Sequence, residues 1–147
     1  MKIRLSTAVS GEYRAVMAGF DRALFEQLVP PGIRTELLRF DGSETGNEVH
    51  LRLHIPLVAP QLWTSRITAH GSNEAEVFFV DEGEVLPFFL SKWQHRHVVA
   101  RSETGSTIID DISFETPRWL PEWLLFPVLW LQFAYRKPIY RRVFAAK

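Results

Sequence analysis

Apolar and polar residues alternate along much of this 147-residue chain, beginning with Lys2–Val9. Alternation with a period of two is typical of a half-buried strand, so this segment is predicted to be one. Six later segments have strand-like patterns and are bounded by turn-forming residues: Ile33–Phe40, Glu48–Ile55, Leu62–His70, Ala75–Asp81, Leu90–Arg101 and Thr107–Glu115. Their short connections favour antiparallel pairing, because parallel pairing needs a long crossover.

Two segments have a helical pattern instead. Glu12–Leu28 carries apolar residues at helical spacing and is expected to form two short helices that divide near Gly19. The segment from about Pro121 to Phe144 is helical in composition, and Pro127 and Pro138 should kink or restart it. Only this last helix is long enough to cover one face of the sheet. The chain is therefore predicted to be an α+β protein of the helix-grip type, with a curved seven-stranded antiparallel sheet wrapped around the C-terminal helix.

Length and composition limit the classes of protein to consider. Residues 1–147 fit one domain, and 46% hydrophobic residues suffice for a core. Lys plus Arg and Asp plus Glu are both 17, so the basic excess of a nucleic-acid binder is missing. Without cysteine, disulfides and thiolate metal sites are excluded. No signal peptide is evident, and Trp119–Ala134 is too short and too interrupted to span a bilayer. We expect a cytoplasmic protein without a cofactor and without stable membrane insertion; a helix lying in a membrane interface is the alternative.

Three motifs resemble one known family. Trp93–His97 (Trp-Gln-His-Arg-His) resembles the Trp-x-His-x-His strand of the SRPBCC ligand-binding proteins, the START-like or pollen-allergen-like superfamily. Gly105–Pro117 is similar to the strand that follows it there, and Phe133–Arg136 (Phe-Ala-Tyr-Arg) resembles the Phe-x-Tyr-Arg of its last helix. The resemblance covers nearly the whole chain and implies the helix-grip fold in a bacterial branch of the family. It implies little about activity, because the superfamily includes lipid carriers, receptors, cyclases and oxygenase subunits.

Polar residues interrupt the predicted inner face of the last two strands. Asp110 is the only polar member of the face that it shares with Ile112, and His95 and His97 share the matching face of the preceding strand. A tight hairpin at Thr104-Gly105 predicts that His97 lies opposite Ile112 and diagonal to Asp110. An unpaired buried carboxylate is costly, so we expect a His–Asp interaction.

This cluster has four interpretations. A hydrogen-bonded pair can fix the strand register, or the side chains can serve as polar anchors in a mainly apolar pocket. His97 and Asp110 are candidate catalytic residues if the pair performs acid–base chemistry. Metal binding by His95, His97 and Asp110 is the fourth interpretation, and we predict no metal.

The preferred function is binding or sequestration of a small, mostly apolar molecule, lipid-, isoprenoid- or polyketide-like, in an internal cavity. The predicted ligand-binding residues are Trp63, Phe79, Trp93, His95, His97, Asp110, Ile112, Phe114, Leu129 and Phe133, with Leu51, Leu53 and Ile67 as further lining. Two alternatives stay open. One is an enzyme of the cyclase or hydrolase type acting through His97 and Asp110. The other is a regulatory module that binds a protein partner through Trp119 and Trp123, although these tryptophans are expected to pack on the sheet.

Overall fold

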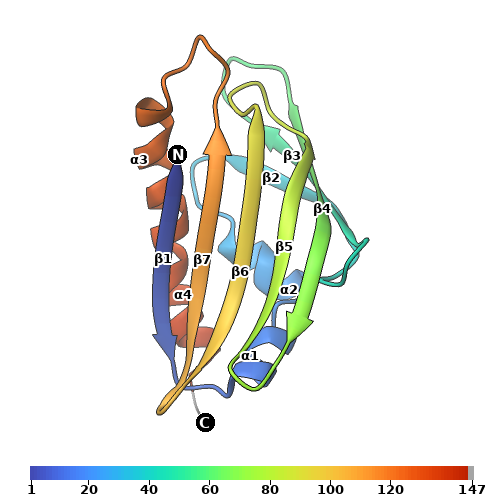
Figure 1. Cartoon of the computed structure of the whole chain (residues 1–147). Coiled ribbons are helices and arrows are strands. Elements are labelled where there is room, and N and C mark those ends of the chain that lie inside the picture. The colour runs from blue at the N-terminus through green and yellow to red at the C-terminus, as the bar shows by residue number, and fades with distance from the viewer. Residues whose placement is uncertain (146–147) are drawn as a thin grey trace.

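The computed structural model describes residues 1–145, and its elements follow the predicted order (Figure 1). The strands are β1 (Lys2–Val9), β2 (Arg34–Phe40), β3 (Glu48–His54), β4 (Gln61–Ser72), β5 (Glu76–Val85), β6 (Lys92–Ser102) and β7 (Gly105–Glu115). The helices are α1 (Tyr13–Ala18), α2 (Arg22–Leu28), α3 (Glu122–Ala134) and α4 (Arg136–Val143).

All seven strands form one antiparallel sheet in the order β1-β7-β6-β5-β4-β3-β2. The sheet curves, and the helices lie on one side of it, with α3 and α4 running along β1 and β7 (Figure 1). Register irregularities between β4 and β5 and between β2 and β3 mark β-bulges, which increase the bend of a sheet. The predicted α+β helix-grip architecture is confirmed.

The hairpin between β6 and β7 corrects one prediction. Ser102 pairs with Gly105, so Glu103 and Thr104 form the turn and His97 lies directly opposite Asp110. The predicted register was therefore displaced by two residues. Because side chains alternate with a period of two, this displacement leaves every side chain on its predicted face.

The C-terminal helical segment is divided into α3 and α4 at Tyr135, although the backbone stays right-handed helical there. Pro138 lacks an amide hydrogen, so the hydrogen bond it would donate to Ala134 is lost, and the helix restarts as predicted. Pro127 lies inside α3 without ending it.

Two apolar clusters fill the space between sheet and helices. The first packs Leu125, Leu129 and Phe133 of α3 against strands of the sheet, with Phe114 among the residues beneath them. The second packs α4, α1 and α2 onto the other end of the sheet, around the fully buried Tyr140. The last helical segment therefore holds the two ends of the sheet together.

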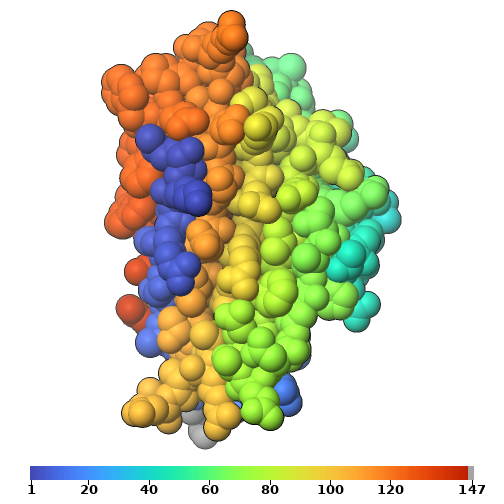
Figure 2. All heavy atoms as spheres, in the orientation of Figure 1, coloured from blue at the N-terminus to red at the C-terminus, as the bar shows by residue number. Residues whose placement is uncertain are grey.

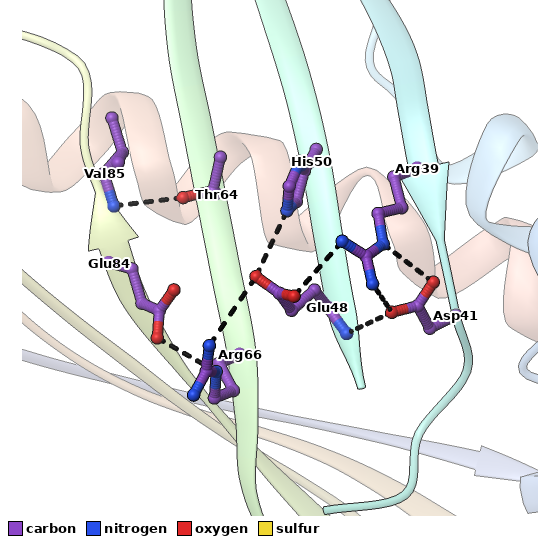
Figure 3. A network of polar contacts seen from close by, with 8 residues as sticks. All are labelled: Arg39, Asp41, Glu48, His50, Thr64, Arg66, Glu84 and Val85. Carbon is purple, nitrogen blue, oxygen red and sulfur yellow. Dashed lines mark hydrogen bonds and ion pairs between the residues drawn. The ribbon is translucent and has the colours of Figure 1, made fainter. Parts of the chain in front are cut away.

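The opposite face of the sheet is polar. Figure 3 shows ion pairs that join Glu48 of β3 to Arg39 of β2 and Arg66 of β4, with His50 beside the same carboxylate. Val49, Leu51 and Leu53 alternate with these residues and point inward, toward the cavity described next. The amphipathic alternation of β3 therefore places His50 on the outer face of the sheet.

Candidate functional site

A cavity of about 400 Å³ lies between the inner face of the sheet, α2 and α3. Apolar side chains form most of its wall. Seven of the predicted ligand-binding residues line it, namely Trp63, Phe79, Trp93, His95, His97, Leu129 and Phe133. Leu51, Leu53 and Ile67 line it as well.

Three predicted ligand-binding residues do not reach the cavity wall. Asp110, Ile112 and Phe114 lie on the predicted inner face of β7 and are almost fully buried. Ile112 and Phe114 pack in the core under α3, and Asp110 lies behind the two histidines. The alternation of β7 identified the face correctly, but it could not show that α3 covers that part of it.

The polar residues of the site form a hydrogen-bonded chain. Oδ1 of Asp110 lies 2.9 Å from Nε2 of His95 and 3.1 Å from Nδ1 of His97. The other nitrogen of His95 lies 3.4 Å from Oδ2 of Asp81, a residue of β5. Trp93 donates its indole N–H to the same carboxylate across 3.1 Å. The chain therefore runs from Trp93 through two carboxylates and two imidazoles.

Burial and these contacts fix the protonation states. Burial opposes the charge of His95, but its hydrogen bonds to Asp110 and Asp81 outweigh this and raise its pKa to about 9. Burial would raise the pKa of Asp110, yet the hydrogen bonds from His95 and His97 hold that pKa far below its usual range. At neutral pH the ring of His95 is thus cationic and the carboxyl group of Asp110 is anionic.

His97 takes the opposite state. Burial lowers the pKa of His97, and the positive charges of His95 and Arg136 add to this effect, so the hydrogen bond to Asp110 is outweighed. An ionised carboxylate only accepts hydrogen bonds, so Nδ1 of the neutral ring must carry the proton. Nε2 of His97, a residue that lines the cavity, is then an acceptor that is buried and has no hydrogen-bond partner among the described residues.

Arg136 is a site residue that the sequence interpretation missed. It was not among the predicted ligand-binding residues, whereas the structure places it on the cavity wall beside Phe133, whose ring centroid is 4.2 Å from the guanidinium carbon. Its Nε is the other buried side-chain atom among residues 1–145 without a hydrogen-bond partner. The signal available was its place in the Phe-x-Tyr-Arg motif, because Phe133 was already predicted to line the cavity.

The His95, His97 and Asp110 side chains could also be considered as metal ligands, since they offer ligand atoms within 4.8 Å of one another. Metal binding requires unprotonated nitrogens. The raised pKa of His95 keeps its ring protonated, and Nδ1 of His97 holds the proton that it donates to Asp110. In the structure these residues form a hydrogen-bonded cluster, and binding a metal would require the loss of both protons.

The site thus combines an apolar container with one buried acceptor, Nε2 of His97, and one buried donor, Nε of Arg136. Such sparse polar groups in an apolar wall orient a ligand. An imidazole whose other nitrogen is held by a carboxylate is also the arrangement of a general base. Geometry alone allows both uses.

Comparison with known proteins agrees on the fold. Neither the family models nor the curated proteins contain a match to this chain. Protein CV1439 from Chromobacterium violaceum has a similar structure, with a TM-score of 0.70, 14% identity and 99% of both chains covered. Zhui aromatase/cyclase from Streptomyces sp. R1128 matches 95% of this chain and 90% of its own at a TM-score of 0.65 and 11% identity. Norcoclaurine synthase from Thalictrum flavum matches 95% of this chain and 86% of its own at a TM-score of 0.59 and 10% identity. At such identities the likeness concerns the fold alone, and the chain has the helix-grip fold.

Proposed function

We propose that the protein binds a small, mostly apolar molecule, lipid-, isoprenoid- or polyketide-like, in the cavity under α3. The cavity itself carries the proposal, because it offers about 400 Å³ of mainly apolar space, and two of the residues that line it each have a buried polar atom without a partner. Leaving a buried donor or acceptor unpaired costs roughly 1–3 kcal/mol, so a ligand that satisfies both gains affinity. The resemblance of Trp93–His97 to the SRPBCC strand supports the same function.

The two unpartnered atoms define the polar group of the ligand. Nε2 of neutral His97 accepts a hydrogen bond, and the guanidinium of Arg136 donates one. A hydroxyl group satisfies both, because it donates and accepts. We infer that the ligand carries one hydroxyl, phenol or enol group on an otherwise apolar skeleton.

The first test is native mass spectrometry of the purified protein, followed by denaturing extraction of any bound molecule. We expect a co-purifying apolar compound or, with apo protein, saturable binding of 2-naphthol followed by its fluorescence. Leu51→Trp directs an indole into the cavity and should reduce binding at least tenfold. Arg52→Trp places the same indole on the opposite face of β3 and is the matched control. Equal binding by the two variants would contradict a ligand site in the cavity.

The polar anchors are tested separately. His97→Phe keeps an aromatic ring but removes the acceptor, and we expect about tenfold weaker binding of 2-naphthol, since a hydrogen bond contributes roughly 1 kcal/mol or more. Naphthalene lacks the hydroxyl and should bind wild type and variant alike. A loss of affinity for both probes would indicate a packing defect instead of a lost anchor.

Acid–base conversion of the ligand is the second candidate function. The observation that favours it is the pairing of His97 with ionised Asp110, which leaves the lone pair on Nε2 of this cavity-lining residue without a partner. Two proteins of the same fold are named as an aromatase/cyclase and a norcoclaurine synthase. Once a ligand is identified, Asp110→Asn should abolish turnover while binding persists; unchanged turnover would exclude His97 as the base.

A further inference from the structure

The outer side of α3 is apolar and uncovered in the described structure. We call it the apolar ridge, and it consists of Trp119, in the turn before α3, and of Trp123, Leu124, Val128, Trp130 and Leu131. The expectation that the tryptophans pack on the sheet is wrong for Trp119 and Trp123, whose exposed fractions are 64% and 67%. α3 is apolar around its whole circumference, and only the side of Leu125, Leu129 and Phe133 can face the core. So large an apolar surface marks an interaction site.

The ridge continues into a basic end. Arg141 and Arg142 in the last turn of α4 are exposed, as are Trp123 and Leu124 at the start of α3. α3 and α4 lie end to end along β1 (Figure 1), and their residues form one edge of the molecule (Figure 2). The apolar ridge and its basic end therefore lie on the same edge of the molecule and can contact one partner surface together.

Charge is divided unequally along the chain. Residues 118–147 contain six lysines and arginines and one acid, whereas residues 1–117 contain eleven basic and sixteen acidic residues. The single acid, Glu122, lies 3.2 Å from the amino group of Met1. Arg118, Lys137, Arg141 and Arg142 form no ion pair within residues 1–145. The net charge of the whole chain is zero, but residues 118–147 are net positive and residues 1–117 are net negative.

We propose that the apolar ridge and its basic end dock the protein on the surface of a bilayer that contains anionic lipid. Tryptophan is enriched where proteins meet the headgroup region, and cations beside such residues are attracted by anionic lipid. A second copy of the chain fits less well, because the ridge and α4 offer no acidic group to pair with the cations. No helix within residues 1–145 is long and apolar enough to cross the bilayer, so the helix lies along the surface.

Docking also gives the cavity a route for an apolar ligand. Val128 belongs to the ridge and lines the cavity, and Phe88, which stacks on Trp119 at 6.0 Å between ring centroids, lines it as well. Both side chains are partly exposed, so the cavity wall reaches the surface at the ridge. A molecule entering there passes from lipid to cavity without crossing water. This step rests on the proposed ligand binding, whereas docking itself does not.

The experiment is co-sedimentation of the purified protein with vesicles. One set is phosphatidylcholine alone, and the other is equal parts phosphatidylcholine and phosphatidylglycerol. We expect binding to the anionic vesicles and weaker binding to the neutral ones. Replacing Arg141 and Arg142 by serine should lower binding to anionic vesicles about 25-fold, at roughly fivefold for each cation. Arg34→Ser with Arg52→Ser removes equal charge from β2 and β3 and should leave binding unchanged.

The apolar contribution needs its own variants. Trp119→Ser with Trp123→Ser should reduce binding to both kinds of vesicle at least tenfold, whereas Leu62→Ser, at an exposed position of β4, should not. Circular dichroism checks that each variant is folded. Absence of binding to either vesicle by folded wild type overturns the proposal. A dimer in sedimentation analysis that dissociates in the double tryptophan variant, without vesicle binding, would assign the ridge to a second copy. If wild type binds anionic vesicles but does not bind 2-naphthol, only the ligand proposal is overturned.

Discussion

The charged state of His95 makes a testable contribution to stability. Its pKa is raised to about 9 in the folded protein, against 6.5 for the unperturbed group. The folded state therefore holds this proton more tightly than the unfolded state does. The stabilisation is complete below pH 6.5 and is lost as pH rises from 6.5 through about 9. At about 1.4 kcal/mol per pKa unit, this amounts to roughly 3 kcal/mol.

The perturbation that isolates this contribution is His95→Gln, which keeps a side-chain N–H for Asp110 but does not titrate. Unfolding in urea, followed by tryptophan fluorescence, gives the free energy of unfolding at pH 6.5, 7.5, 8.5 and 9.5 for both proteins. We expect the wild type to lose its advantage over the variant by about 3 kcal/mol across this range. Taking the difference cancels the contributions of groups that are common to both proteins.

Two outcomes would refute the reasoning. If the difference between wild type and His95→Gln is constant from pH 6.5 to 9.5, His95 does not carry the extra proton. If the advantage grows with pH, the ring is neutral and its burial dominates. His97 gives an opposite check on the acid side: its pKa is lowered from 6.5, so its contribution is lost as pH falls below that value.

Three further predictions concern the core, the hairpin and the metal hypothesis. Phe114→Ala should lower the free energy of unfolding by about 3–5 kcal/mol in the same urea assay, because its ring is fully buried opposite Trp93; a loss below 1 kcal/mol would show that α3 does not cover it. Gly105→Ala should cost at least about 2 kcal/mol, since φ is +146° and a Cβ would meet the carbonyl of Val9; an unchanged melting temperature would contradict this geometry. Zinc at millimolar excess should leave the melting temperature unchanged, because His95 is protonated; a zinc-dependent rise would favour a metal site.

Sequence periodicity predicted the faces of the strands but not the depth of burial. His95, His97 and Asp110 could be assigned to the inner face because a period of two allows only two choices. Whether an inward residue meets the core or the cavity depends on where α3 lies, which strand alternation does not encode. For this reason Phe114 and Trp93, neighbours across β6 and β7, have different surroundings: Trp93 reaches the cavity and Phe114 does not.

The errors in the helix have a different physical origin. The rule that large apolar residues are buried failed for Trp119 and Trp123, because an apolar helix on the edge of a domain can bury only one side. Arg136 was missed as a site residue for the converse reason, since a cation in the last helix is ordinarily solvated. Neither error could be avoided without knowing the rotation of α3 and α4 about their axes.

The charges around the cavity predict which ligands it prefers. The carboxylates of Asp81 and Asp110 are balanced by the cations of His95 and Arg136, while His97 is neutral, so the site has no net charge to offer an anion. A neutral hydroxyl such as that of 2-naphthol should therefore bind without uptake of a proton. An ionised analogue, 2-naphthoate, should bind more weakly or bring about one proton with it, which His97 accepts and which raises the pKa of that ring.

Calorimetry in phosphate and in Tris, buffers with very different ionisation enthalpies, measures this uptake at pH 7.5. Tighter binding of 2-naphthoate than of 2-naphthol with no proton uptake would show that the cavity carries net positive charge, and the protonation states assigned to His95 and Asp110 would then be wrong.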